Sequence, residues 1–267
     1  MTVELSADEA RRIALWSQGL LQAAPAGLHR AAPARQRQAV LDMLGRLGAV
    51  QLDTISVLAR SHELVAYARL GEVSRPAIEE AYWSGESAFE YWSHAACILP
   101  MASWPWFAFR RRSYVRRGLR WHEVPKRAVT QVRKRLRADG PLTTRQIGGA
   151  KRSSQWWDWS EAKVAVEYLL DVGEVVCTRR PGWRRIYDLT ERVLPPRLRS
   201  DPSYVESDGV VGPPDEVCLV RLVAAGARCV GVGTSGDIAD VHRLRQSEVR
   251  RHADEAGLVP VRVAGWG

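Results

Sequence analysis

Cysteine, lysine and long apolar runs are scarce in this sequence, and each scarcity excludes a class of protein. The four cysteines show neither a Cys-x-x-Cys spacing nor a histidine partner at metal-ligand intervals. We therefore expect reduced cysteines in the core, no metal site and no other cofactor. The apolar run at 164–170 is broken by Glu167 and Tyr168 and is far too short for a membrane span, so we expect no membrane partner.

The amino-terminal residues lack the pattern of a secretion signal. Glu4, Asp8 and Glu9 stand where a signal peptide needs a basic region followed by an apolar stretch. We therefore expect a cytoplasmic protein.

Lysine supplies only four of the 39 basic residues, so the net charge of +9 comes almost entirely from arginine. Such an excess favours a polyanionic partner, either nucleic acid or an acidic membrane surface. An arginine bias is also typical of proteins from GC-rich genomes, so the charge alone does not establish a nucleic-acid partner. The chain is 46% hydrophobic and 26% charged, a globular composition with room for one large core or two to three small ones.

The middle of the chain has the clearest pattern of secondary structure. The expected elements are a basic helix at 126–139, a short helix at 145–148, a longer helix at 160–173, and strands at 174–177 and 185–189. Thr143 or Thr144 can cap the short helix, and the tip 179–183 joins the two strands. Helix, turn, helix and two-stranded hairpin is the order of a winged helix.

Related patterns flank this segment. Ser6 and Glu9 form a capping-box pattern at the start of a predicted helix. The elements expected before the middle segment are helices at 6–21 and 34–45 and extended stretches at 50–55 and 88–100. Those expected after it are helices at 215–226, 237–244 and 247–258 and a wing strand at 258–263.

These patterns predict an α+β, mainly helical protein built from tandem winged-helix domains, of which the last is incomplete. The expected domains are a first winged-helix-like domain at 1–122, a second winged helix at 123–195, a Pro-rich linker at 196–214 and a partial third winged helix at 215–267.

The triplet Gln51-Leu52-Asp53 is the most informative short motif. In an extended segment, residues two apart point to the same face while the middle residue packs inward. An amide and a carboxylate would then share one surface. An ordinary half-exposed strand has the same alternation, so the triplet alone leaves both interpretations open.

The run 47–64, which contains this triplet, is similar to the signature of the YcaQ and AlkZ family of DNA glycosylases. Segments at 9–20, 89–94 and 234–240 agree with the same family, so the resemblance spans nearly the whole chain. In that family a Gln-apolar-Gln or Gln-apolar-Asp triplet is the catalytic pair. The resemblance therefore implies that Gln51 and Asp53 are catalytic, and their Gln-Leu-Asp form is closer to the YcaQ branch, which unhooks interstrand crosslinks. We expect the C-terminal β-barrel of family members to be absent from these residues.

The chemistry of such an enzyme suits these two side chains. A purine alkylated at N7 is already cationic, so its glycosidic bond breaks without a strong acid and leaves a sugar cation to stabilise and a water to deliver. Asp53 is the candidate stabiliser and water activator, and the Gln51 amide can hold the water or the sugar. No lysine lies near the triplet, so we expect a monofunctional glycosylase. Its partner would be double-stranded DNA with alkylated or crosslinked bases, without an obligate protein partner.

Basic residues elsewhere are candidates for DNA contact. The candidate DNA-binding residues are Arg60, His62, Arg110, Arg111, Arg112, Arg116, Arg179, Arg180, Arg184 and Arg185. A solvated basic face is the alternative for the arginines between 110 and 116, and an ordinary surface position is the alternative for His62. The tryptophans at 156, 157 and 159 are expected to pack in a core rather than stack on bases.

Two other functions remain compatible with the sequence. A non-catalytic winged-helix transcriptional regulator would share the fold, and an inactive truncated relative would share the motif. The pair Gln51 and Asp53 discriminates against the regulator, which has no need of it.

Overall fold

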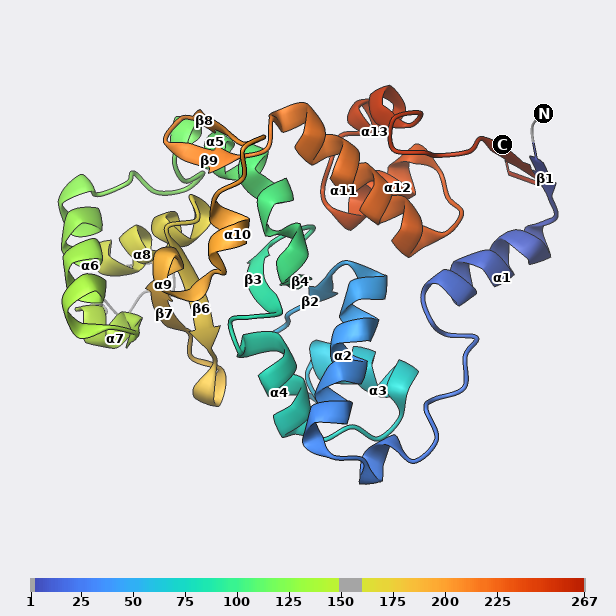
Figure 1. Cartoon of the computed structure of the whole chain (residues 1–267), viewed down its shortest axis with the longest axis horizontal. Coiled ribbons are helices and arrows are strands. Elements are labelled where there is room, and N and C mark those ends of the chain that lie inside the picture. Colours follow the sequence, from blue (N-terminus) through green and yellow to red (C-terminus); the bar gives the residue numbers. More distant parts are fainter. Residues whose placement is uncertain (1–2, 149–159, 267) are drawn as a thin grey trace. The chain divides into compact units, whose positions relative to one another are not determined.

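The computed structural model describes residues 3–148 and 160–266, which form a mainly helical protein with small sheets (Figure 1). The expected α+β, mainly helical class is therefore confirmed. The chain divides into two compact units. Unit 1 comprises Met1–Ala81, Trp92–Pro100 and Glu216–Gly267, and unit 2 comprises Tyr82–Tyr91 and Met101–Asp215. Residues expected in the first and third domains thus share unit 1, while the boundaries at 122, 195 and 214 stay a prediction.

The first helix of unit 1 starts where the sequence predicts it. The Ser6 hydroxyl accepts from the Glu9 N–H, and the Glu9 carboxylate accepts from the Ser6 N–H at 2.8 Å, which is the predicted capping box. The helices of unit 1 are α1 (Ala7–Ser17), α2 (Pro33–Leu47), α3 (Ser61–Leu70), α4 (Arg75–Trp83, shared with unit 2), α11 (Asp215–Val230), α12 (Ser235–Val241) and α13 (Gln246–His252), with a 3-10 turn at Leu28–Arg30. Its strands are β1 (Val3–Leu5), β2 (Val50–Gln51), β4 (Ala96–Pro100) and β10 (Val261–Val263).

Two helices of unit 1, α2 and α11, each bury an apolar face. Val40 and Leu44 of α2 are buried, as are Leu222 and Val223 of α11. Val40 and Leu44 are four residues apart and so share one face of α2, and the adjacent Leu222 and Val223 both lie within the apolar stripe of α11. The core of this unit therefore fixes the end of α2, from which β2 continues.

The carboxyl-terminal strand differs from the prediction. The sequence indicates a first wing strand at 258–263, and the structure forms only β10 there. This strand pairs in parallel with β1, through Val3 with Val261 and Leu5 with Val263. The partner is thus at the other end of the chain, which no local pattern could reveal.

Unit 2 contains the remaining elements. They are β3 (Ala88–Trp92), a 3-10 segment at Met101–Phe107, α5 (Ala108–Arg117), α6 (Lys126–Asp139), β5 (Leu142–Thr143), α7 (Thr144–Ile147), α8 (Glu161–Asp171), β6 (Val175–Arg179), a 3-10 turn at Pro181–Trp183, β7 (Ile186–Leu189), α9 (Thr190–Val193), α10 (Pro196–Arg199), β8 (Val205–Ser207) and β9 (Val210–Gly212).

The segment from α6 to β7 has the element order expected from the sequence. β7 lies between β5 and β6 in an antiparallel sheet, and α6 and α8 pack on the same core. Val132 and Leu136 of α6 meet Leu169 of α8 and Tyr187 of β7 in that core. Thr143 caps α7 by accepting from the Gln146 N–H, as predicted.

The stretch expected to be a plain linker at 196–214 contains local structure. It forms α10 and the hairpin β8–β9, whose turn residues Asp208 and Gly209 have φ of +53° and +70°. Two consecutive positive φ values are what a tight hairpin turn requires. The prolines of this stretch predict a break between two helical segments, but they do not predict the β8–β9 hairpin.

Candidate active site

Gln51 and Asp53 lie where the chain leaves β2. This strand pairs antiparallel with β4, with Val50 opposite Ile98 and Gln51 opposite Cys97. Val50 and Leu52 are buried, with exposed fractions of 2% and 7%, whereas Gln51 is exposed and Asp53 is half-buried. The alternation places the apolar side chains in the core and leaves the amide and the carboxylate outside it.

Each member of this pair is held by one specific contact. The Oε1 atom of Gln51 lies 3.2 Å from Nε2 of His94. The Oδ1 atom of Asp53 accepts a hydrogen bond from the backbone N–H of Ile55 at 2.9 Å, which closes an Asx turn. The Ser61 hydroxyl also donates to the Gln51 carbonyl at 2.8 Å, which ties β2 to the start of α3.

His94 was not among the site residues predicted from the sequence, and the structure places it beside Gln51. Its Nδ1 atom lies 3.2 Å from the Val241 carbonyl, and its own carbonyl accepts from Arg243 at 2.5 Å. The adjacent Ser93 hydroxyl donates to the Val241 carbonyl at 2.9 Å. The end of α12 thus fixes the imidazole that faces Gln51. The available signal was the position of His94 inside the segment 89–94.

Arg60 and His62, two of the candidate DNA-binding residues, lie at the start of α3. The chain is helical from Ser61 onward, because the Glu63 carboxylate accepts from the Arg60 N–H at 2.9 Å and caps α3. His62 is therefore turned inward and is 3% exposed, so it has no surface to offer DNA. The Arg60 guanidinium donates to the Thr54 carbonyl at 3.0 Å and braces the loop after Asp53.

Arg111 and Arg112, two further candidates for DNA contact, are buried and have little surface to offer DNA. They are 3% and 2% exposed. Arg112 donates to the Gly212 carbonyl at 3.0 Å and to the Asp215 carboxylate at 2.6 Å. Arg111 donates to the Trp104 carbonyl at 2.9 Å, and its guanidinium lies 4.2 Å from the centre of the Trp104 ring. Both arginines hold α5 in unit 2.

The other two arginines of this cluster keep more exposure. Arg110 is half-buried, and its guanidinium lies 5.4 Å from the centre of the Phe107 ring. Arg116 is exposed and forms an ion pair of 2.5 Å with Asp208. The helical period accounts for Arg110, which lies two residues before Arg112 and therefore off the face that residues 108, 111 and 112 share. Arg116 follows Arg112 by four residues and is exposed in the last turn of α5.

Arg180 and Arg185, two of the four candidate arginines in the β6–β7 hairpin, are likewise structural. The Glu90 carboxylate accepts from Arg180 and from Arg185, with contacts of 2.6 Å to each, and Arg185 also donates to Glu167. Burial alone would raise the pKa of Glu90, but the guanidinium groups of Arg185 and Arg180 lower it to about 2. Arg180 and Arg185 are therefore committed to an ion network around the buried Glu90 carboxylate, and their guanidinium groups are not offered to DNA in this structure.

Arg179 and Arg184 remain on the outside of the β6–β7 hairpin. Both are exposed, and neither forms an ion pair within the part of the chain that the structure describes. The predicted position of these two side chains is compatible with phosphate contact.

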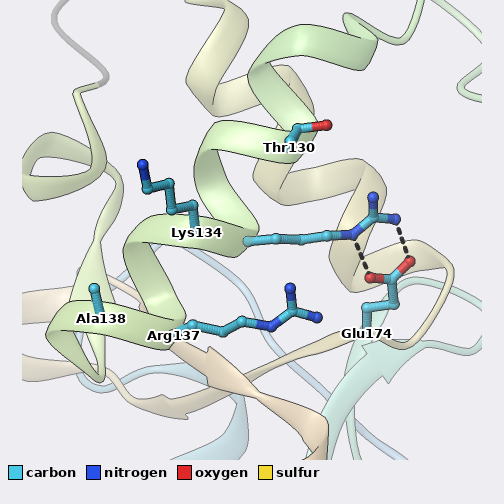
Figure 2. Close-up of a pocket in the computed structure, with 6 residues that line it drawn as sticks. Thr130, Lys134, Arg137, Ala138 and Glu174 are labelled. Carbon is cyan, nitrogen blue, oxygen red and sulfur yellow. Dashed lines mark hydrogen bonds and ion pairs between the residues drawn. The ribbon is translucent and has the colours of Figure 1, made fainter.

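A second basic surface follows α6. Thr130, Lys134, Arg137 and Ala138 line an open cavity of about 710 Å³, together with Glu174 and Arg133 (Figure 2). Arg133 is neutralised by two hydrogen bonds of 2.6 Å to Glu174, drawn as dashed lines in Figure 2. Lys134 and Arg137 have no ion-pair partner among residues 3–148 and 160–266, so this groove carries two uncompensated positive charges.

The structure also bears on the expectations about metals, cysteines and membranes. All four cysteines are buried and unbridged. In the described ranges, no group of three His, Cys, Asp or Glu side chains could hold a metal ion. No single described helix has the length and apolarity to cross a membrane, although α11 and α12, bent by 106°, meet that test as a pair. The tryptophans at 156, 157 and 159 lie outside the described residues.

The chain is similar in structure to the DNA glycosylase AlkZ of Streptomyces sahachiroi, with a TM-score of 0.59 and 16% sequence identity. The match covers 96% of this chain and 66% of AlkZ, so the chain spans somewhat under two thirds of the length of that protein. At this identity the likeness establishes the fold alone. The family model described as DNA glycosylase AlkZ-like matches residues 44–267, which include the loop of Gln51 and Asp53 as well as the whole of unit 2. The chain therefore belongs to the AlkZ-like DNA glycosylase family.

Proposed function

We propose that this protein hydrolyses the N-glycosidic bond of alkylated or crosslinked purines in double-stranded DNA. One observation carries the proposal: Gln51 and Asp53 lie together outside the core, each oriented by a hydrogen-bonding group, in a chain of the AlkZ-like family. A non-catalytic DNA-binding protein has no need of a carboxylate on the surface that would face the polyanion. Such a carboxylate repels phosphate, so its presence there favours catalysis.

The proposed reaction requires only what these residues supply. The bond between sugar C1′ and the purine nitrogen breaks, and its electron pair neutralises the cationic base. The positive charge that develops on the sugar is stabilised by the carboxylate of Asp53. A water oxygen then bonds to C1′, and its proton passes to Asp53 and on to solvent. Because Oδ1 of Asp53 already accepts from Ile55, the other carboxylate oxygen is the one offered to sugar and water.

Gln51 is proposed to position the water or the sugar. Its Oε1 atom faces His94, so its amide NH2 group is directed away from the imidazole and can donate to an oxygen of the substrate. His94 acts through Gln51 in this scheme and is a positioning residue. The fixed orientation matters because a freely rotating Gln51 amide would turn its oxygen toward the substrate as often as its NH2 group.

A lyase step is not part of the proposal. The amine needed for a Schiff base would have to come from a lysine, and the four lysines lie at 126 and beyond, outside the segment of Gln51 and Asp53. The proposed products are therefore a free base and an intact abasic strand, as for a monofunctional glycosylase.

DNA affinity is proposed to come from the exposed cations of unit 2. Arg179 and Arg184 lie on the wing of the segment α6–β7, which we interpret as a winged helix, and Lys134 and Arg137 lie on α6. Arg110 and Arg116 are further candidates on α5. Each phosphate contact releases counterions, so binding should weaken steeply as salt increases.

The exposed position of Gln51 favours bulky substrates. A base tethered to both strands cannot rotate fully into a deep pocket, so an enzyme that unhooks crosslinks needs a catalytic pair that reaches the sugar from outside. Gln51 is exposed and Asp53 is half-buried, which meets that need.

The proposal is tested by incubating the purified chain with duplex DNA that carries a single N7-methylguanine, and with a duplex joined by an N7-guanine crosslink. Released base is quantified by chromatography, and strand separation is resolved on a denaturing gel. We expect base release from the first substrate and conversion of the second to single strands. Sequence-specific DNA binding without release from either substrate would favour a regulator. Release of methylated base without unhooking would refute the open-site part of the proposal alone.

A further inference from the structure

The loop that follows the catalytic pair exposes an unusual amount of apolar surface. In this loop, residues 54–59, which we term the apolar loop, Ile55 is 70% exposed, Val57 88% and Leu58 87%. Single exposed aliphatic residues are common on protein surfaces, but three within four positions form a contiguous patch of the kind that marks an interaction site.

Polar contacts at its base keep the apolar loop from folding onto the core. Ser56 and Arg60 form an antiparallel bridge that closes the loop, and the Arg60 guanidinium donates to the Thr54 carbonyl at 3.0 Å. On the other side, the Ile55 N–H donates to Asp53. The tip is therefore projected outward in a defined shape, so little ordering entropy is lost on binding.

We propose that the apolar loop is a wedge that enters the DNA duplex, with Val57 and Leu58 inserted against the base step beside the damaged nucleotide. The inference rests on the proposed function and names the part of the DNA that this loop contacts. DNA is the partner of the apolar loop because the loop is continuous with the proposed active site: the Ile55 N–H donates to the same Asp53 carboxylate that would act on the sugar. Any substrate seated on Asp53 must therefore lie against this loop.

The local charge also fits a DNA duplex rather than an apolar protein surface. The loop 54–59 contains no acid, Arg60 closes it, and Arg243 is exposed beside His94. The nearby Glu63 is engaged by the backbone of Arg60 and by the side chain of Arg75 at 3.2 Å. Aliphatic side chains can pack against the faces of the bases while the flanking guanidinium groups contact the phosphates. Aliphatic side chains inserted at a base step unstack the bases and kink the duplex.

A wedge supplies what an open catalytic pair lacks. Separating one base step widens the groove at the damaged sugar, so Gln51 and Asp53 can reach C1′ without complete rotation of the base. A crosslinked base, which cannot rotate out, is accessible by this route.

The test uses a duplex with 2-aminopurine, whose fluorescence rises when it is unstacked, next to an N7-methylguanine whose 2′-fluoro sugar slows base loss. Fluorescence on binding is compared for the wild-type chain, the double variant Val57→Ser with Leu58→Ser, and the variant Val259→Ser. Val259 is 67% exposed in the same unit and controls for the loss of an exposed aliphatic side chain. Base release from the unfluorinated duplex is measured in parallel.

We expect the wild type and Val259→Ser to raise the fluorescence, and the double variant to lose most of the rise and to release base about tenfold more slowly. Leu58→Met, which keeps the apolar tip, should behave as wild type. An equal rise for the double variant, or none for the wild type, would overturn the wedge, as would a change in oligomeric state without a change in fluorescence. If the fluorescence rise depends on Val57 and Leu58 but no protein releases base, the wedge stands and the proposed function fails.

Discussion

The buried carboxylate of Glu90 offers a quantitative prediction about stability. Glu90 is 1% exposed, and two guanidinium groups lie within 2.6 Å of its oxygens. Burial alone would raise the pKa of Glu90 above its ordinary value of 4.5, but these two guanidinium groups lower it to about 2. A shift of that size corresponds to about 3 kcal/mol of favourable interaction in the folded state. Removing one partner of a buried ion pair costs about 3–5 kcal/mol in other proteins, which agrees.

We therefore expect Glu90→Gln to lower the free energy of unfolding of unit 2 by about 3 kcal/mol at pH 7. The sign of the pH dependence follows from the depressed pKa. The stabilisation is fully present above pH 4.5 and is lost as the pH falls toward 2, because the unfolded carboxylate takes up its proton first. The difference between wild type and variant should therefore shrink on acidification.

Urea denaturation followed by circular dichroism, at several pH values between 7 and 3, measures this difference. Glu206→Gln is the matched control, because Glu206 is an exposed acid on β8 of the same unit. A loss below 1 kcal/mol for Glu90→Gln would show that the ion network does not stabilise the fold. A loss that stays constant with pH would show that the pKa of Glu90 is not lowered in the folded protein.

Three further outcomes are expected. Arg112→Lys should lower the free energy of unfolding by about 2 kcal/mol, because an ammonium cannot reproduce the forked bonds to Gly212 and Asp215; thermal melting measures this. Replacing Lys134 and Arg137 together by Ala should reduce the slope of log affinity against log salt by about 2, and an unchanged slope would remove the α6 groove from the DNA path. Gln51→Ala should release base more slowly than wild type, and equal rates would remove Gln51 from the site.

The parts of the fold that local patterns determine could be predicted from the sequence. The bounds of α6 follow from its apolar period and the glycine after Asp139, and the start of α7 follows from the cap at Thr143. The outward placement of Gln51 follows from the alternation with Val50 and Leu52 in the same way. In each case the decisive residues lie within one turn or one strand of the feature.

The failed assignments depend on partners that are distant in the sequence. Arg112 is buried because carbonyls about a hundred residues later accept its hydrogen bonds. The Arg180 side chain is only 8% exposed because it is paired with Glu90. An arginine that is solvated and one that is paired look identical in a list of charges. The burial of His62 has a local cause, because the Glu63 carboxylate caps α3 at Arg60 and the chain is helical from Ser61 onward.

The central claim is that the carboxylate of Asp53 stabilises the sugar cation. Single-turnover release of N7-methylguanine by Asp53→Asn tests it most directly, with DNA affinity measured on the same preparation. Asp42→Asn is the isosteric control, since Asp42 is an exposed acid on α2 that accepts from Gln38. We predict that Asp53→Asn slows release by at least about 100-fold with affinity nearly unchanged, while Asp42→Asn releases base at the wild-type rate. Release by Asp53→Asn at the wild-type rate would contradict the account.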